Sequence, residues 1–387
     1  MPDAPAIHLD RLRDFALHPI GEKVRRGERL SAADAITLFR TPDLLGLGHL
    51  ADAVNRAKHG DVVTFASNQH INPTNVCVLR KTCVFCGYAR LPKEAGAYRY
   101  TIEQVLAEAA QASDSMTREF HIVGGLDMQA GLAYYTTMFR ALKAAHPQVH
   151  IKALTAVEIA HIARIEKMSW TDVLIALREA GLDTMPGGGA ETFSAAVRDV
   201  IADKKLGGAD YINVHRAAHK LGIRTNCTML YGHVETIEDR VEHLTMLRDL
   251  QDDTGGFLAF IPLAYHPDDN ELGITLGRQG TSTTGFDDLR NLAVGRLFLD
   301  NFSHIKSHWI MVSPALTQVA LAFGVNDIEG TVVREKIYHA VGAQTKQGMS
   351  LDELLRLIRG AGKLPAERDS FYQIIRSFDD APVGAAA

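Results

Sequence analysis

The chain has 387 residues, of which 46% are hydrophobic and 22% charged, and its formal net charge is −5 at pH 7. This balance is typical of a globular protein, and lysine and arginine are scattered rather than gathered into the basic face that a nucleic-acid partner requires. No apolar run approaches the roughly 20 residues of a membrane helix, and the charged N-terminal residues are unlike a signal peptide. We therefore expect a cytoplasmic protein with no nucleic-acid and no membrane partner.

The first sixty residues are predicted to be helical. Leu47, Leu50, Val54 and Ala57 recur at helical spacing, which places their side chains on one face. We treat residues 1–60 as an N-terminal helical segment.

From about residue 62 the pattern changes to short β-prone runs that alternate with amphipathic helices. The predicted strands are 62–65, 71–76, 119–123, 150–155, 184–186, 225–231, 257–262 and 308–312. Repeated strand–helix units favour a parallel sheet, and seven or eight such strands from 71–76 onward fit a TIM-barrel-like (β/α) core better than an open doubly wound sheet, which is the alternative. We expect the core to span 61–275 and residues 276–387 to complete or cover the barrel.

Helix boundaries can be predicted at several points. Thr101 with Gln104, and Ser350 with Glu353, have the spacing of capping boxes that begin helices. Gly181 and Gly222 follow helical patterns and are typical of helix C-terminal caps.

A barrel places functional groups at the carboxyl ends of its strands. Polar or glycine-rich segments follow six of the predicted strands, which is the pattern expected of a ligand site. These segments are 75–86, 124–127, 155–158, 187–191, 232–235 and 265–268.

Three of the four cysteines, Cys77, Cys83 and Cys86, lie within ten residues of one another. In a reducing compartment such a group favours a metal or redox site over a disulfide framework. Three thiolates can hold an iron–sulfur cubane and leave one iron open. Zinc is the competing occupant, with Cys227 or His70 as a fourth ligand, although Cys227 lies inside a predicted strand and is typical of a core thiol.

The cysteine loop follows a predicted strand at the start of the barrel, and here the chain resembles the radical S-adenosylmethionine (SAM) superfamily. Most members carry C-x3-C-x2-C, whereas this chain has C-x5-C-x2-C. The resemblance implies a [4Fe-4S] cluster on Cys77, Cys83 and Cys86 whose open iron binds SAM. It also places Phe85 near the adenine of SAM.

Further cofactor contacts are expected around the barrel mouth. By resemblance, the backbone of Gly124 and Gly125 approaches the SAM amino group, and Tyr231 with Gly232 packs on adenine. The glycines at 187–189 precede a helix and can form an anion-binding nest, beside which Glu191 can bond ribose hydroxyls and Arg198 can pair with a carboxylate. The alternative at 187–198 is a turn followed by ordinary surface charges.

Longer stretches resemble radical SAM enzymes of the futalosine route to menaquinone. These stretches are 70–77, 120–126, 152–158, 182–191, 229–235, 250–257 and 304–311. The segments at 120–125, 152–158 and 264–267 favour the aminofutalosine synthase family. The cyclic dehypoxanthinyl futalosine synthases and the FO synthase subunits are related alternatives, and a zinc-dependent barrel hydrolase is the alternative from another class.

The resemblance implies a radical addition to the enol ether of 3-[(1-carboxyvinyl)oxy]benzoate, with SAM consumed and a low-potential donor such as flavodoxin or ferredoxin supplying the electron. Two substrate carboxylates require hydrogen-bond donors or cations, and a radical requires exclusion of water. The polar side chains predicted to ring the barrel mouth are candidates for these contacts. They are His70, Asn72, Asn75, Thr155, Glu158, His233, Tyr265 and His266.

Overall fold

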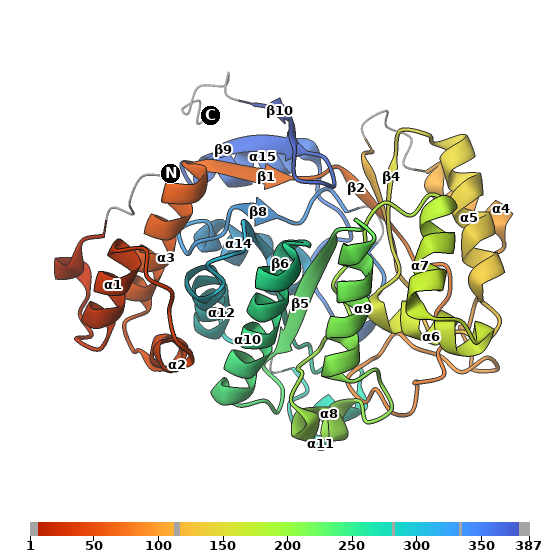
Figure 1. The fold of residues 1–387 in the computed structure, drawn as a ribbon, viewed down its shortest axis with the longest axis horizontal. Helices are drawn as coiled ribbons and strands as arrows, with labels where there is room; N and C mark the ends of the chain where they lie inside the picture. Colours follow the sequence, from red (N-terminus) through yellow and green to blue (C-terminus); the bar gives the residue numbers. More distant parts are fainter. Residues whose placement is uncertain (1–6, 112–116, 281–282, 333–334, 379–387) are drawn as a thin grey trace.

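The computed structural model describes residues 7–111, 117–280, 283–332 and 335–378. A barrel of parallel strands forms its centre, helices surround the barrel, and a helical segment from the N-terminus lies at one side (Figure 1). None of the helices in these residues is both long and apolar enough to cross a membrane.

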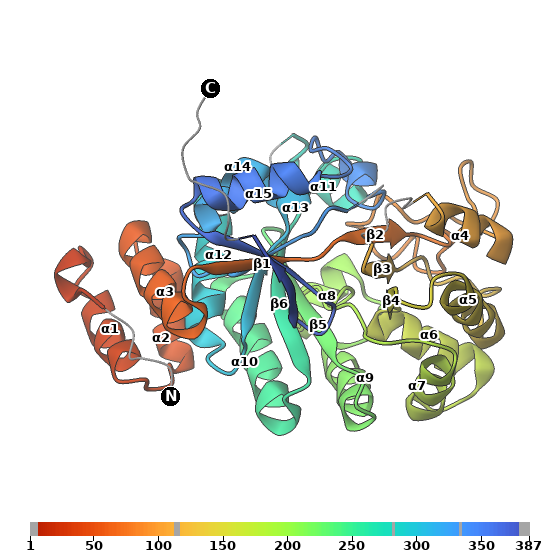
Figure 2. The ribbon, with the colours of Figure 1, turned by 90° about the horizontal axis from the view of Figure 1, so that it is seen from above.

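The N-terminal segment forms three helices, as the spacing of its apolar residues predicts: α1 (Leu17–Arg25), α2 (Ala32–Arg40) and α3 (Leu44–His59). Ser31 and Asp34 form a capping box at the start of α2, which satisfies two backbone N–H groups that the helix cannot pair. Helix α3 packs against α12 and α2 packs against α10, so the segment is attached to one flank of the barrel (Figure 2).

The barrel strands run in parallel, and their order closes the sheet. Strand β2 pairs with β3 and β3 with β4, while β5 to β8 pair in sequence and β8 returns to β1. Single bridges at Thr184 and Met185 join β4 to β5. Because β1 and β2 are separated by only two residues, this segment closes the barrel, so the open-sheet alternative does not apply. The strands are β1 (Val62–Phe65), β2 (Asn68–Ile71), β3 (Glu119–Ile122), β4 (His150–Ala153), β5 (Thr225–Tyr231), β6 (Phe257–Ala264), β7 (His304–Ser307) and β8 (Asp327–Ile328).

The helices that alternate with these strands cover the outside of the barrel (Figures 1 and 2). The predicted capping boxes at Thr101 and Ser350 are confirmed, and they begin α4 and α15. The helices after the N-terminal segment are α4 (Ile102–Ala109), α5 (Leu132–Ala145), α6 (Ala156–Glu166), α7 (Trp170–Glu179), α8 (Ala195–Ile201), α9 (Gly208–Lys220), α10 (Ile237–Thr254), α11 (Glu271–Thr275), α12 (Gly285–Phe298), α13 (Trp309–Val312), α14 (Pro314–Ala320) and α15 (Leu351–Gly360).

Three strand predictions are wrong. The strand predicted at 71–76 is displaced, because β2 ends at Ile71 and residues 72–76 form a loop. Residues 184–186 form no strand and contribute only the single bridges at Thr184 and Met185. The apolar run 308–312 forms a short helix, α13, and the strand lies just before it, as β7. The Trp309 indole N–H donates to the carbonyl of Glu329 over 3.0 Å, so this run packs as a buried turn after the strand instead of extending it.

The barrel continues past residue 275, since residues beyond it supply α12, β7 and β8. The last strands, β9 (Leu364–Arg368) and β10 (Ile374–Ser377), form an antiparallel pair beside β1. The segment between them closes the end where the barrel strands begin. There the Arg368 guanidinium bonds the Asp327 carboxylate at 2.7 and 2.9 Å, and Tyr372 stacks on His304.

Candidate active site

A cavity of about 290 Å³ opens at the carboxyl ends of the barrel strands. This is the end of a β/α barrel where ligands bind. Twelve of the predicted site residues line it, including all three clustered cysteines. They are His70, Thr155, Glu158, Tyr265, His266, Phe85, Gly124, Gly125 and Glu191, with the predicted metal ligands Cys77, Cys83 and Cys86.

The cysteine loop follows β2 and is held in place by its backbone. The Cys77 N–H donates to the carbonyl of Arg90 over 2.9 Å, and the Val78 N–H donates to that of Leu126 over 3.0 Å. The backbone N–H groups of Leu126 and Leu79 bond the Cys77 sulfur, an arrangement that tunes cluster thiolates. The loop is therefore shaped by hydrogen bonds that leave the sulfurs facing the cavity.

The three thiols are close enough to influence one another electrostatically. Burial raises the pKa of Cys77 and raises that of Cys83 to about 12, and the charge of Lys205 opposes this shift. Thiols on one cavity wall, which would repel one another as thiolates, fit a positively charged iron centre that would neutralise them.

The structure supports a zinc site less well than an iron–sulfur cluster. The remaining cysteine, Cys227, lies within β5, is fully buried, and its thiol points to the carbonyl of Ala259 at 3.7 Å. It belongs to a different apolar cluster from Cys83, so it does not complete a four-cysteine set. Within the part of the chain that the structure describes, no three His, Cys, Asp or Glu side chains are grouped as a single metal ion needs. A cubane spreads its ligands over separate irons.

Gly124 and Gly125 follow β3 and pack directly on the chain that leads to Cys77. A Cβ at Gly125 would lie 2.2 Å from the carbonyl oxygen of Val76, and one at Gly124 would lie 2.8 Å from that of Thr74. Only glycine permits this approach. The two residues therefore support the cysteine loop as well as lining the cavity.

Glu158 connects two strand ends. Thr155 and Glu158 form the capping box that begins α6, and the Gly124 N–H donates to Glu158 Oε1 over 3.0 Å. Burial raises the pKa of Glu158 to about 7 against the opposing effect of these hydrogen bonds. The Glu158 carboxyl group therefore takes up a proton at a higher pH than an ordinary glutamate does.

Glu191 forms an ion pair with Lys205, a cavity residue that the sequence pattern did not reveal. The Lys205 ammonium also lies 5.3 Å from the centre of the Phe85 ring. Although burial alone lowers the pKa of a lysine, the Glu191 carboxylate raises that of Lys205 overall, so the ammonium is charged. Phe85, Glu191 and Lys205 thus form one wall beside the thiols.

The predicted carboxylate partner Arg198 lies outside the cavity lining. Its guanidinium donates to the carbonyls of Ala190, Thr192 and Leu206. These bonds hold the loop that carries Glu191, so we assign Arg198 to positioning that loop.

Asn72 and Asn75 also lie outside the cavity lining. Asn75 bridges the loop by accepting from the Tyr98 N–H and donating to the Gly96 carbonyl, and Asn72 donates to the carbonyl of Val123. Because Asn75 uses both its amide nitrogen and oxygen on the backbone, and Asn72 uses its amide nitrogen, both residues brace the chain between β2 and the cysteine loop in this structure.

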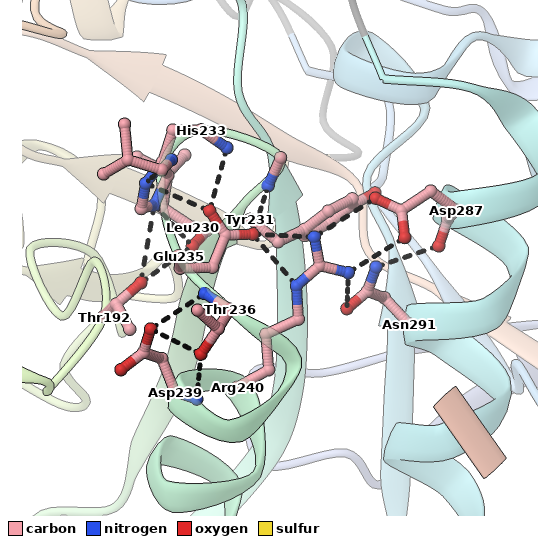
Figure 3. A network of polar contacts seen from close by, with 12 residues as sticks. Thr192, Leu230, Tyr231, His233, Glu235, Thr236, Asp239, Arg240, Asp287 and Asn291 are labelled. Atoms are coloured by element: carbon pink, nitrogen blue, oxygen red, sulfur yellow. Dashed lines mark hydrogen bonds and ion pairs between the residues drawn. The ribbon is translucent and has the colours of Figure 1, made fainter. Parts of the chain in front are cut away.

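Tyr231 and His233 form part of a polar network behind the cavity wall (Figure 3), and the Gly232 N–H donates to Glu235 in the same network. The Tyr231 hydroxyl donates to Asp288, and His233 lies between the carbonyl of Leu230 and the carboxylate of Glu235. Arg240 bonds both Glu235 and Asp287 in the same network. The three predicted residues therefore fix the end of β5 and do not line the cavity.

Tyr265 and His266 line the cavity after β6 and are anchored on their far sides. The Tyr265 hydroxyl donates to Asn270 over 2.6 Å, and His266 Nε2 lies 3.0 Å from the carbonyl oxygen of Met311. Burial raises the pKa of Tyr265 to about 12 and lowers that of His266. Both side chains are therefore neutral near pH 7.

Another part of the lining contains His70 with three residues that the sequence pattern did not single out: His121, His308 and Glu329. His70 on β2 stacks on His121 on β3, with ring centroids 4.6 Å apart. These residues come from strand ends that are far apart in sequence, so no local motif marks them.

Comparisons with known proteins agree with this geometry. The model of the radical SAM superfamily matches residues 71–247, and that of the CofH/MqnC C-terminal region matches residues 254–380. Among solved structures, methylornithine synthase is similar with a TM-score of 0.71 and 18% identity, covering 90% of this chain and 97% of that one. HydG, the FeFe-hydrogenase maturase from Carboxydothermus hydrogenoformans, has a TM-score of 0.72 and 17% identity and covers 92% and 80%.

The closed barrel and the thiol loop after its first strand are those of a radical SAM enzyme, and the chain belongs to the radical SAM superfamily. Enzymes of this superfamily use a [4Fe-4S] cluster and SAM. More particularly, the chain is 46% identical over 368 residues to aminodeoxyfutalosine synthase of Thermus thermophilus, covering 95% of this chain and 98% of that protein. It is 43% identical to the Streptomyces coelicolor enzyme of the same name, covering 92% and 94%. This membership sets aside the zinc-dependent hydrolase.

Proposed function

We propose that this protein is an aminodeoxyfutalosine synthase that joins the 5′-deoxyadenosyl group of SAM to 3-[(1-carboxyvinyl)oxy]benzoate, in menaquinone biosynthesis. The products are 6-amino-6-deoxyfutalosine, methionine and bicarbonate or CO2. The observation that carries the proposal is the 46% identity that extends over nearly the whole of both chains. It includes the C-terminal part that completes the barrel, as well as the cysteine loop.

The cluster and SAM, when bound, supply the 5′-deoxyadenosyl radical that adds to the enol-ether double bond. Cys77, Cys83 and Cys86 hold the cluster, and the Gly124–Gly125 backbone keeps their loop against β3. Phe85 and the Glu191–Lys205 pair lie beside the thiols and are placed to bind SAM. Buried apolar lining residues such as Leu230 and Ala264 exclude water from the cavity, which protects a radical from quenching.

The main alternative within the superfamily is the cyclase step of the same route. The chain is 35% identical over 368 residues to cyclic dehypoxanthine futalosine synthase of Streptomyces coelicolor, which is 8 percentage points below the synthase from that organism. Because both comparisons cover most of the chain, the difference in identity favours the synthase.

The partners follow from the same chemistry. We propose that a low-potential flavodoxin or ferredoxin reduces the cluster, and that the protein works in the cytoplasm, where a reducing environment keeps the three thiols free for iron.

The test is a single-turnover assay with anaerobically reconstituted, reduced enzyme, SAM and 3-[(1-carboxyvinyl)oxy]benzoate, analysed by mass spectrometry. We expect the mass of 6-amino-6-deoxyfutalosine and one methionine for each product molecule. Turnover of dehypoxanthine futalosine, with free 5′-deoxyadenosine but no adduct from the benzoate, would instead identify the cyclase.

A further inference from the structure

The cavity lining has two parts that differ in chemistry. At the thiol end, the cysteines lie in an apolar cluster with Leu126 and Leu230. At the histidine end, His70 lies against His121, and His308 lies against Tyr338 and Glu329. A ligand that contacts both ends therefore meets sulfur and apolar atoms at one and imidazole rings at the other.

Two nitrogens at the histidine end lack partners. His70 Nε2 and His308 Nδ1 are buried and have no hydrogen-bond partner in the described part of the chain, and each side chain is 8% exposed. Leaving such a group unpaired costs about 1–3 kcal/mol. Because both residues line the cavity, a ligand in the cavity can satisfy these nitrogens.

Neighbouring aromatic rings hold the His70 and His308 rings in place. His70 stacks on His121, and His308 packs edge-on against Tyr338 with ring centroids 5.2 Å apart. His308 Nε2 is 3.8 Å from the Glu329 carboxylate, which is beyond hydrogen-bond reach. A neutral imidazole carries one proton that can sit on either nitrogen, so each ring can present an N–H at its unpartnered position.

The neighbouring carboxylates are neutralised by other groups. Glu329 accepts from Asn68 Nδ2 over 2.8 Å and pairs with Lys306 at 3.1 Å. Glu335 accepts from the backbone N–H groups of residues 337–339 and lies 2.7 Å from His339 Nδ1. Their negative charge is therefore largely compensated, and a third carboxylate can approach the unpartnered nitrogens.

We propose that His70 and His308 bind the ring carboxylate of the aromatic substrate and so direct its enol ether toward the thiol end of the cavity. This inference rests on the proposed function, since it assigns one end of that substrate. At neutral pH the substrate has hydrogen-bond acceptors but no donor, so its partners must be N–H or O–H groups. Its ring carboxylate is the group farthest from the reacting double bond, so the two can contact different ends of the cavity.

The inference can be tested by calorimetric titration of the cluster-loaded enzyme with SAM and without reductant, so that no turnover occurs. The probes are 3-[(1-carboxyvinyl)oxy]benzoate and 2-phenoxyacrylate, which lacks the ring carboxylate. We expect His70→Phe and His308→Phe to weaken binding of the first compound about 10- to 100-fold, since each removes a hydrogen bond to a charged group. Binding of the second compound should be unchanged.

Matched variants separate hydrogen bonding from packing. His70→Gln places an amide near Nε2 and His308→Asn places one near Nδ1, so both should recover much of the affinity that the phenylalanine variants lose. His161→Phe is the control, because His161 is buried outside the cavity and bonds the carbonyl of Asp127. Iron content and thermal midpoint are measured for every variant.

The inference is overturned if both probes weaken alike in the histidine variants, or if neither weakens. Its failure can be told apart from that of the proposed function. A wild-type enzyme that forms the adduct, with the same KM in His70→Phe, contradicts the carboxylate site alone. A wild-type enzyme that binds the benzoate through these histidines but makes no adduct contradicts the synthase function alone.

Discussion

Buried charged and polar groups are paired differently at the two ends of the barrel. At the end where the strands begin, Lys152 pairs with Glu119 at 2.7 Å, and Arg368 pairs with Asp327 through two bonds. At the cavity end, three thiols face one another and two histidine nitrogens have no partner in the described residues. At the first end, buried charges are matched by opposite charges of the chain itself, whereas at the cavity end unpartnered nitrogens lie beside a space that a ligand can fill.

This difference separates two reasons for burying a polar group. A buried ion pair often contributes little net stability, but removing one partner leaves an isolated charge and is costly. A polar group that folding leaves unpaired costs free energy that a ligand can recover. Substitutions at the paired end should therefore change stability, and those at the cavity end should change binding and chemistry.

The largest effect is expected at the thiols. Cys83→Ala should prevent stable cluster binding, so that iron and sulfide content and adduct formation all fall below detection, because a cubane cannot be held firmly by two thiolates. Cys227→Ala is the matched control, since that thiol is buried in β5. It should retain the cluster and turnover. An active Cys83→Ala enzyme would contradict the assignment of the site.

At the end where the strands begin, Arg368→Met should lower the free energy of unfolding by about 3 kcal/mol, because it removes both bonds of the guanidinium to buried Asp327 and leaves Lys306, 3.5 Å away, as the remaining cation. Urea denaturation measures this effect. Arg376→Met on the exposed strand β10 is the control and should shift stability by about 0.5 kcal/mol or less. Adding Asp327→Asn to Arg368→Met should restore part of the loss. A single variant as stable as the wild type would show that this end is not held by its ion pairs.

Glu158 should make stability depend on pH. Its pKa of about 7 in the folded protein lies above the ordinary glutamate value of 4.5, so the folded state retains the proton after the unfolded chain has lost it. Stability should therefore fall as pH rises from about 4.5 to 7, by an amount on the order of 3 kcal/mol. The urea midpoint of Glu158→Gln should fall less steeply with rising pH across this range than that of the wild type. Parallel curves for the two proteins would contradict the shifted pKa.

The smallest effect is expected at the surface. Thr101→Ala removes the side-chain acceptor that begins α4 and should cost about 1 kcal/mol. Thr101→Ser keeps the hydroxyl and should stay close to the wild type in thermal unfolding. Neither variant should alter cluster content.

Features that depend on neighbouring residues were predicted more successfully than the way in which distant residues meet in the folded protein. Capping at Thr101 and Ser350 depends on residues three apart, and the strand 225–231 is a short run of β-prone residues between Gly222 and Gly232, so both are predicted correctly. The strand predicted at 308–312 was wrong because a short apolar stretch is compatible with either a strand or one helical turn. Its outcome was decided by the indole of Trp309, which bonds a carbonyl near β8.

The same contrast between local and distant features holds for the predicted site residues. The three cysteines lie in one segment, so their spacing revealed them. Lys205 and His308 reach the cavity from separate units of the barrel, and nothing near them in sequence distinguishes them from other lysines and histidines. Conversely, Asn75 follows a strand in the predicted way, but its amide is used by the backbone at residues 96 and 98. Side-chain direction and competition for hydrogen bonds are tertiary properties that periodicity does not encode.

The segment that closes the barrel has a consequence for the order of folding. The Asp327 carboxylate at the start of β8 is compensated by Lys306 of β7 and by Arg368 of β9, and β9 pairs with β1, which lies far from it in sequence. Contacts between segments so far apart form slowly, because a large loop must close first. Neutralisation of this acid, and with it completion of a water-excluding chamber for the cluster, is therefore expected late in the folding of the barrel.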